Sequence, residues 1–404
     1  MSTPTVTVLP APPVDRPRFW SLVATHVMND FQAGAAAALL PYFVSEQHYD
    51  YAAVAGITFA ATSLSSVAQP VFGWLTDRFA LRPLVLVGLA VAALGIAAAG
   101  LTAANYWVTW IAIAVSGIGS AAYHPPATVD SKQVGGGTNR AMSIFSVGGN
   151  VGAAIAPLGV AIAVGAAGLS GTPLLLIPTA LAVGMYLVAH LRRRRDPAAI
   201  PDAGMPGPAA SATPPGDLWR RFVWLLVVVA LWSLAYIAAR SFVALASIAR
   251  FDIVNEAGTA ILTVFSLSGA AGTLVGGFLA DRFGRVRVLA AGYALATLAA
   301  AGFAVAPSPA LAGVAAGLFG FALFVPFSLH VTLSHSYLPR HLGTASGVTL
   351  GLATSFGGIV TPALGALADG LGPQSVFLAI TAALAAAFVC ALFVRERRDA
   401  GTLA

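Results

Sequence analysis

Three polar residues share one face of an otherwise apolar stretch near the start of the chain. His26, Asn29 and Asp30 are spaced i, i+3 and i+4, and Asp30 lies about 18 Å along a helix from Arg18 at ~1.5 Å per residue. An ionisable group at this depth is costly unless it faces an interior cavity. Because burial disfavours the charged carboxylate, we predict that Asp30 exchanges protons, with His26 as neighbour or relay. We predict that Asn29, on the same face, contacts the substrate. The alternative is a structural hydrogen bond from Asp30 to another helix.

A second polar pair precedes two prolines. Ser120 and His124 share a helix face, and Pro125 and Pro126 follow directly. The prolines remove backbone donors and are expected to bend or break the helix, which leaves carbonyls for a cavity. We predict that Ser120 and His124 bind the substrate, and that His124 can bind a proton instead. The alternative is that His124 holds the bend together. His330, near Pro326, is a weaker candidate of the same kind.

An aromatic stripe ends in a cation further along. Trp232, Tyr236 and Arg240 are spaced i, i+4 and i+8, and Arg240 lies about 28 Å along the helix from Arg221. A guanidinium binds a phosphonate or carboxylate through two parallel hydrogen bonds, so we predict Arg240, with Trp232 and Tyr236, as substrate contacts. It can equally extend to the membrane surface, so both readings stay open.

Small residues form another stripe. Gly148, Gly149 and Gly152 lie beside Asn150, and Pro157 follows. Small residues let helices approach closely, so we predict helix packing here. Asn150 then holds helices together, or else contacts the substrate.

The elements that carry these residues must lie in a membrane. Of 404 residues, 58% are hydrophobic and 9% charged, whereas soluble proteins have roughly 25% charged residues. Runs such as 84–101 do not alternate in polarity, which excludes a β-barrel. A single cysteine excludes a disulfide scaffold. The composition predicts an all-α membrane protein with many spans.

Twelve stretches are long enough to cross a bilayer, which takes about 20 apolar residues each. They are 18–44, 51–75, 83–103, 105–129, 139–167, 171–191, 219–249, 255–280, 286–305, 309–337, 342–368 and 374–394. The Pro-rich linker 192–217 separates two bundles, 18–191 and 218–395, and the tails are 1–17 and 396–404. We expect no cleaved signal peptide in the first 17 residues, which lack an apolar core.

The basic residues indicate the orientation. Of the 21 Lys and Arg residues, only Arg240 and Arg250 fall outside the tails and loops that would share the side of the two termini. This asymmetry predicts cytoplasmic termini. The net charge of +6 therefore reflects topology rather than nucleic-acid binding.

Catalytic and energy-coupling motifs are missing from the sequence. His, Asp and Glu are too scattered for a metal cluster, and no nucleotide-binding loop or nucleophile triad is present. We predict a non-enzymatic protein without metal or cofactor.

The two bundles repeat each other. Gly73, Asp77 and Arg78 return as Gly277, Asp281 and Arg282 at a constant offset of 204. Pro157 corresponds to Pro362, and Gly152 corresponds to Gly357, at nearly the same offset. Such parallel repeats are typical of transporters whose halves rock about a central site.

The repeated loop resembles the signature of the major facilitator superfamily, complete in the second half as Gly277-x-x-x-Asp281-Arg282-x-Gly284-Arg285. In the first half Ala80 and Leu81 depart from it, and Arg82 restores the charge. The resemblance implies twelve transmembrane helices in two six-helix pseudo-symmetric halves, with helices 1, 4, 7 and 10 around the site. It also implies a cytoplasmic latch in which Asp77 faces the start of the eleventh helix and an arginine pairs with Asp130; the alternative is a tight turn only.

A narrower resemblance covers nearly the whole chain. The segments 26–30, 69–70, 117–125, 147–152, 338–339 and 343–347 are similar to the fosmidomycin resistance protein family of drug exporters. The resemblance implies a monomeric, multi-pass inner-membrane antiporter that exports small drugs or metabolites against protons, and hence antibiotic resistance. An uptake symporter or a facilitator for a small organic anion or sugar is the alternative. A transporter-like receptor or lipid-handling enzyme is a third reading, against which the missing catalytic motifs argue.

Overall fold

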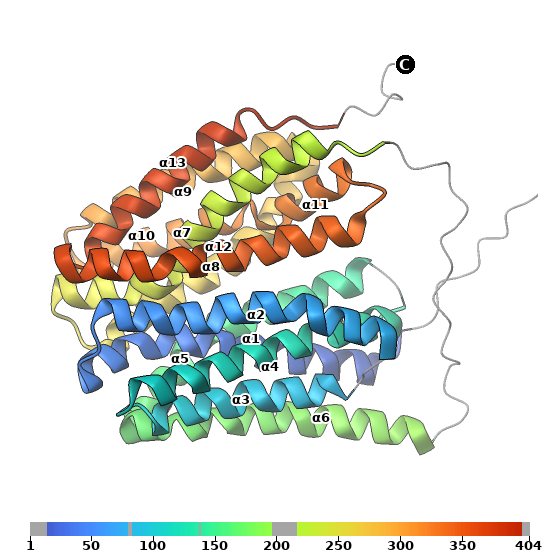
Figure 1. The fold of residues 1–404 in the computed structure, drawn as a ribbon, viewed down its shortest axis with the longest axis horizontal. Helices are drawn as coiled ribbons and strands as arrows, with labels where there is room; N and C mark the ends of the chain where they lie inside the picture. Colours follow the sequence, from blue (N-terminus) through green and yellow to red (C-terminus); the bar gives the residue numbers. More distant parts are fainter. Residues whose placement is uncertain (1–13, 80–82, 137–138, 196–215, 398–404) are drawn as a thin grey trace, which may run out of the picture.

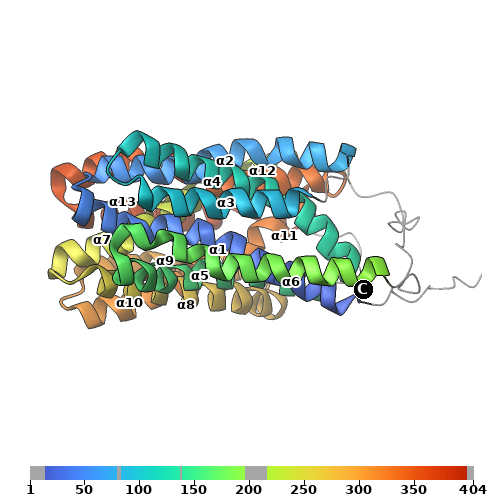
Figure 2. The same cartoon turned by 90° about the horizontal axis from the view of Figure 1, so that it is seen from below.

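The structure is a computed structural model of the chain, and it describes residues 14–79, 83–136, 139–195 and 216–397. All the secondary structure in these residues is helical. The helices run along the long axis of the molecule in two groups (Figures 1 and 2).

The first half contains six α-helices. They are α1 (Arg16–Gln47), α2 (Tyr51–Phe79), α3 (Leu84–Leu101), α4 (Tyr106–Val134), α5 (Asn139–Ala167) and α6 (Leu176–Arg195), with the 3₁₀ helix η1 (Gly168–Leu175) before α6. Helix α1 packs mainly on α5, and α4 packs on α2 and α3. The α1–α5 contact is close because these helices meet at glycines: a Cβ on Gly34 would lie 2.7 Å from the Ala153 carbonyl oxygen.

The second half contains seven α-helices. They are α7 (Trp219–Phe251), α8 (Asn255–Phe283), α9 (Arg285–Val305), α10 (Pro309–Phe324), α11 (Phe327–Tyr337), α12 (Leu342–Leu371) and α13 (Val376–Ala391), with the 3₁₀ helix η2 (Pro373–Ser375) before α13. Helix α10 packs on α8 and α9, and α13 packs on α7 and α9. Together α10 and α11 take the place of one predicted helix, 309–337.

Ten segments of the described chain are long and apolar enough to cross a membrane. One of them, Ile144–Arg192, contains most of α5 and α6, and α1 does not meet the hydropathy criterion. The predicted count of twelve is reached when α1 is included and α5 and α6 are counted separately. Large apolar side chains cover the outside of the bundle, including Phe278 at 76% and Leu298 at 71% exposure, which suits lipid rather than water.

Two proline sites differ from each other in the structure. Helix α4 continues through Pro125 and Pro126 to Val134, so these prolines do not break the helix, which was one of the two outcomes expected for them. A break does occur at Pro326, between α10 and α11. There the indole Nε1 of Trp232 donates a 2.7 Å hydrogen bond to the carbonyl of Leu323, which supports the interrupted backbone.

The halves meet at one end of the molecule. We call the end where α1 begins and α13 leads to the C-terminal residues the termini end, and the other the opposite end. The halves converge at the opposite end and diverge toward the termini end (Figure 1). Within the described chain, hydrogen bonds between the halves lie from mid-bundle to the opposite end: Thr58 to Ser241, Arg240 to Ala33, Asn255 to Ser45, and Asp369 to Tyr51 and Ala52.

Residues 1–13 and 196–215 lie outside the description, so the tails and the linker, like the bundle boundaries drawn from the sequence, stay predictions.

Candidate functional site

A cavity of about 230 Å³ lies between the two halves. Its walls come from α1, α2, α4, α5 and α7, whereas the resemblance led us to expect helices 1, 4, 7 and 10. Most of its polar groups are neutral and belong to the first half, including Thr62, Ser65, Gln69, Ser120 and Asn150. Its charged lining groups are Asp30 and Arg240, with His124 beside Asp30. The cavity therefore combines one carboxyl group and one guanidinium cation with many neutral hydrogen-bonding groups.

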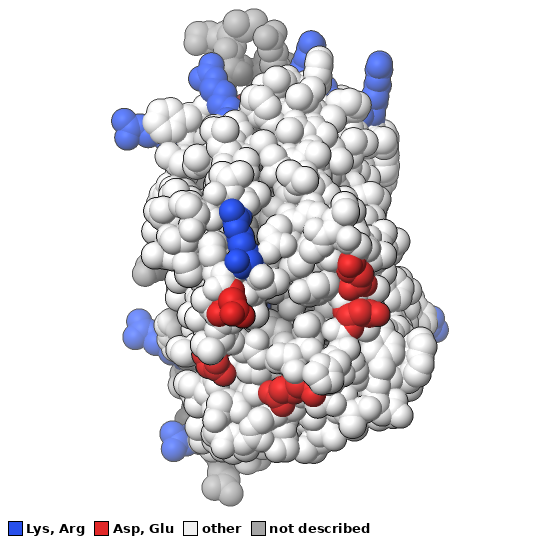
Figure 3. Space-filling view, turned by 90° about the vertical axis from the view of Figure 1, so that its left-hand side faces the viewer, with Lys and Arg blue, Asp and Glu red and all other residues white. Residues whose placement is uncertain are grey.

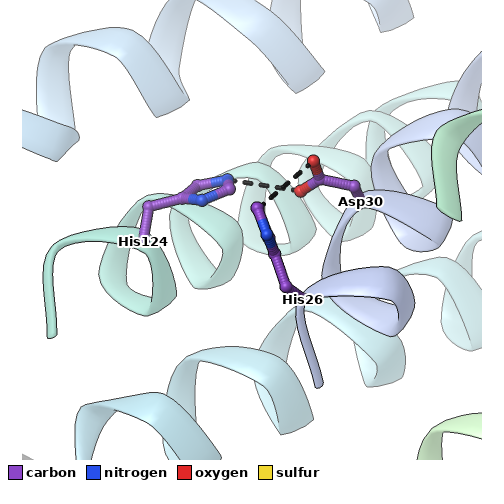
Figure 4. A group of neighbouring side chains, drawn as sticks. All are labelled: His26, Asp30 and His124. Carbon is purple, nitrogen blue, oxygen red and sulfur yellow. Dashed lines mark ion pairs between the residues drawn. The ribbon is translucent and has the colours of Figure 1, made fainter. Parts of the chain in front are cut away.

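Asp30 lies between two imidazoles (Figure 4). The Nε2 atom of His26 is 3.5 Å from one carboxylate oxygen of Asp30, and the Nε2 atom of His124 is 3.4 Å from the other. His26 comes from the same helix as Asp30, and His124 comes from α4. One ligand-type atom from each residue lies within 4.8 Å of the others, so the expectation that His, Asp and Glu are too scattered for a metal-ligand cluster is wrong for these three residues.

The ring of His26 is held in one orientation. Its Nδ1 lies 2.7 Å from the carbonyl oxygen of Phe145, and its ring stacks on Phe145 with centroids 4.1 Å apart. A carbonyl oxygen only accepts hydrogen bonds, so Nδ1 carries the hydrogen. In a neutral His26 the lone pair on Nε2 then points at the carboxylate of Asp30.

Asn29 lies behind this cluster, fully buried, and is not part of the cavity wall. Its side-chain Nδ2 is 3.1 Å from Asp30 Oδ1, 2.9 Å from Ser120 Oγ and 3.2 Å from His124 Nε2. This placement argues against direct substrate contact, which we predicted for Asn29. It lets Asn29 orient the side chains of Asp30 and His124 instead.

The glycine stripe of α5 makes room for the cluster. A Cβ on Gly149 would lie 2.7 Å from the Nε2 and Cε1 atoms of His26 and would also overlap Asp30. Gly148 packs on Val23, and a Cβ on Gly152 would overlap the backbone of Val27. Asn150, on the same helix, lines the cavity, which favours the substrate contact over the packing role we preferred.

Arg240 lies in the cavity wall rather than at the membrane surface. It donates to the hydroxyl of Tyr236 at 3.0 Å and to the carbonyl of Ala33 at 3.5 Å. A guanidinium has five N–H donors, so several remain for a ligand.

The other members of the aromatic stripe have different surroundings. Tyr236 lines the cavity, but Trp232 is fully buried. The rings of Trp232 and Tyr236 are stacked with their centroids 4.8 Å apart. His330 is also buried, and its Nε2 lies 2.7 Å from the hydroxyl of Tyr293. Trp232 and His330 therefore do not reach the cavity in this state, and we no longer propose them as substrate contacts.

The signature loop of the second half forms a defined turn. Gly284 has a φ of +90°, a conformation that L side chains rarely adopt. The next residue, Arg285, donates its backbone N–H to Glu396 at 2.9 Å, and its side chain contacts Glu396 at 3.7 Å and the carbonyl of Thr332 at 3.2 Å. Asp281 and Arg282 are exposed. Glu396, which sequence reasoning missed, thus ties this loop to the C-terminal segment.

The first-half latch stays a prediction. Arg82 and the side chain of Asp77 lie outside the described residues. Asp130 is buried in α4, and Arg78 is exposed with its guanidinium 5.4 Å from the ring centroid of Trp74. A Cβ on Gly73 or Gly277 would meet no atom within 4 Å, so packing in this state does not require glycine there. Pro157 lies inside α5.

Comparisons with known proteins agree with this architecture. The family model described as Major Facilitator Superfamily matches residues 22–362 and 254–404. An uncharacterized MFS-type transporter of Bacillus subtilis (strain 168) is 32% identical over 360 residues, covering 88% of this chain and 87% of the relative. The Fosmidomycin resistance protein of Escherichia coli (strain K12) is 26% identical over 365 residues, covering 87% and 86%.

Solved transporters share the fold. A nucleoside transporter superposes with a TM-score of 0.71 at 15% identity, covering 94% of this chain and 100% of the other. The E. coli fucose:proton symporter superposes with a TM-score of 0.60 at 19% identity, covering 94% and 98%. By fold, family model and relatives, the chain belongs to the Major Facilitator Superfamily.

Proposed function

We propose that the protein is a proton-coupled secondary exporter of small drugs or metabolites that works by alternating access. Membership of the superfamily supports small-molecule transport. The similarity to a fosmidomycin resistance protein makes fosmidomycin-like phosphonates the first substrates to test. The observation that carries proton coupling is the carboxylate of Asp30, which lies in the cavity wall between the imidazoles of His26 and His124.

The geometry of this cluster supports a bound proton. With hydrogen on Nδ1, a neutral His26 offers only a lone pair to Asp30, and two acceptors facing each other repel. The contact becomes attractive when one proton lies on Nε2 of His26 or on the carboxylate. The cluster is therefore a proton site of three residues, with Asp30 as its acid and His26 and His124 as neighbours that can pass the proton on.

Substrate and proton would use the same cavity. Arg240 supplies a cation suited to a phosphonate or carboxylate, and Asn150, Ser120 and Gln69 supply neutral partners. Substrate binding that displaces the proton from the Asp30 cluster into the water on the open side would give exchange of the two as the halves alternate.

Arg240 also favours a second candidate, an uptake symporter or facilitator for a small organic anion or sugar. Protonation of Asp30 removes a negative charge from the cavity that Arg240 shares, so an anion would bind more readily together with a proton than against it. An anion leaving a negative-inside cell also gains about 2.3 kcal/mol per charge per 100 mV without any proton.

We propose that the protein works as a monomer in a bacterial inner membrane with both termini in the cytoplasm. The charge distribution supports the orientation. The described basic residues lie at the termini end apart from Arg240 and Arg250. Exposed acids gather at the opposite end (Figure 3): Glu46, Asp50, Asp252, Glu256 and Asp369.

Proteoliposomes loaded with a pH-sensitive dye test the proposal. Fosmidomycin is added outside under an imposed pH gradient, with wild type, Asp30→Asn and the control Asp252→Asn, an exposed residue far from the cavity. We expect substrate-driven proton movement in wild type and control, opposite in direction to the substrate, and at least a tenfold loss in Asp30→Asn.

The direction of the proton separates the candidates. Proton and substrate moving together would support the symporter. Substrate crossing without any proton movement in wild type would overturn proton coupling and leave a facilitator.

A further inference from the structure

The two halves are joined most closely along α2 and α12, which run antiparallel. Glycines of α12 face α2 at this contact. A Cβ on Gly358 would lie 2.6 Å from the hydroxyl of Ser63, and a Cβ on Gly365 would lie 2.5 Å from the carbonyl oxygen of Tyr51. The backbones therefore approach closely from mid-bundle to the opposite end. Asp369 lies one helical turn beyond Gly365, on the same face of α12.

The carboxylate of Asp369 binds the start of α2 across the boundary between the halves. One oxygen accepts from the backbone N–H of Tyr51 at 2.7 Å, and the other accepts from Ala52 at 3.0 Å. These are the first two N–H groups of α2, which no residue within that helix can satisfy. A carboxylate at a helix N-terminus also interacts favourably with the helix dipole.

The next two N–H groups of α2 are satisfied locally. Asp50 accepts from Ala53 through its side chain at 2.6 Å and from Val54 through its carbonyl at 3.2 Å. All four free N–H groups at the start of α2 thus have partners, two from its own half and two from the other half. If the halves separate at this end, the N–H groups of Tyr51 and Ala52 lose Asp369 and must bond to water. The carboxylate of Asp369 also leaves the N-terminus of the α2 dipole, whereas Asp50 stays in place.

We infer that Asp369 is a gate residue that holds the opposite end closed by capping α2 and must release it when the cavity opens to that side. Because α2 and α12 are antiparallel, the expected latch of Asp77 at the start of α12 is the matching contact at the termini end. Each carboxylate would cap the partner helix in one of the two states. This inference rests on two rocking halves and holds whichever substrate or ion crosses.

Distances between spin labels test the gate on the purified full-length protein without substrate or pH gradient. One pair, Glu46→Cys with Leu371→Cys, spans the opposite end, and a second pair, Lys132→Cys with Arg282→Cys, spans the termini end; all four residues are exposed. Cys390→Ser provides the background. Asp369→Asn keeps the shape of the side chain but removes its charge. Asp50→Asn is the matched control, because it weakens a cap at the same helix start within one half.

We expect Asp369→Asn to raise the ratio of open to closed populations at the opposite end about 2- to 5-fold, the range that corresponds to the loss of one negative charge at a helix N-terminus. The termini-end pair should gain a shorter distance in the same proportion, because opening one end closes the other. Asp50→Asn should leave both distributions unchanged.

Equal distributions in Asp369→Asn and the parent would overturn the inference, and so would a change at the opposite end alone, since that indicates local fraying. Asp369→Glu provides a rescue test if the asparagine variant is poorly folded: it retains the charge and should keep the parent distribution. These outcomes are independent of the transport assay, which reports on Asp30.

Discussion

At the scale of single residues, the proposed proton site depends on the absence of a side chain at Gly149 and on the buried amide of Asn29. Asp30, His26 and His124 converge because Gly149 has no side chain where α5 passes α1. Asn29 then orients the group from behind through its amide. The site is thus positioned by one missing side chain and one buried donor.

Gly149→Ala tests this positioning. Its methyl group would overlap Asp30 and press on His26, and overpacking of this kind costs about 1–3 kcal/mol. We expect a lower thermal midpoint of the purified protein and at least tenfold slower substrate-driven proton movement. Gly165→Ala on the same helix is the control, because a Cβ there meets no atom within 4 Å and alanine favours helix. Unchanged proton movement in Gly149→Ala would contradict the tight geometry of the cluster.

The guanidinium of Arg240 is the second residue on which the account depends. Arg240→Gln should weaken binding of an anionic substrate at least tenfold, and Arg240→Lys should restore it only in part, because an ammonium lacks the planar fork. Titration calorimetry measures the affinity of each variant for fosmidomycin and for its uncharged ester. Equal losses for the charged ligand and its ester would show that Arg240 does not bind the anionic group.

At the scale of elements, the sequence placed the helices more reliably than their interruptions. The helix expected at 139–167 matches α5 at both ends, and the others deviate by a few residues, because apolar length fixes a span. The paired prolines of α4 suggested an interruption, yet the helix continues there. At the break beside Pro326 the carbonyl of Leu323 accepts from Trp232, a residue of another helix, and no local pattern reveals this contact.

Trp232→Phe tests the role of this indole. It leaves the carbonyl of Leu323 without the buried donor, which costs about 1–3 kcal/mol. Trp224→Phe is the control: its indole also donates to a carbonyl, that of Cys390, but at an exposed position where water can replace it. Thermal unfolding of the purified variants should show a larger loss for Trp232→Phe. A larger loss of thermal stability in Trp224→Phe than in Trp232→Phe would show that the indole of Trp232 does not support the break.

The candidate site was only partly predictable for a related reason. Spacing along α1 placed His26, Asn29 and Asp30 on one face, and the depth of Asp30 suggested a cavity. Which of the three reaches that cavity depends on α4 and α5, so the burial of Asn29 could not be read from one helix. Asp369 and Glu396 looked like ordinary charges near helix ends, because their partners lie far away in the sequence.

At the scale of the whole molecule, the halves are joined at the opposite end and the cavity reaches toward the termini end. If the termini are cytoplasmic, this is the inward-facing state. Gln69, which lines the cavity on the part of α2 nearer the termini end, should then be accessible from the cytoplasmic side.

Thiol labelling of Gln69→Cys in a Cys390→Ser background checks this state. A membrane-impermeant reagent should react at least tenfold faster in inside-out than in right-side-out vesicles. Val67→Cys, 75% exposed on the outer surface of the same helix, should face lipid and react slowly in both. Faster labelling of Gln69→Cys in right-side-out vesicles would reverse the proposed orientation or the state.

The central claim is that Asp30 couples transport to protons without being required for substrate movement as such. The most direct measurement compares two modes of radiolabelled fosmidomycin transport in proteoliposomes for wild type and Asp30→Asn: flux driven by a pH gradient, and exchange at equal pH. We expect Asp30→Asn to lose at least nine-tenths of the pH-driven flux but to retain exchange, because alternation with bound substrate needs no proton step. Retention of pH-driven flux by Asp30→Asn would contradict it.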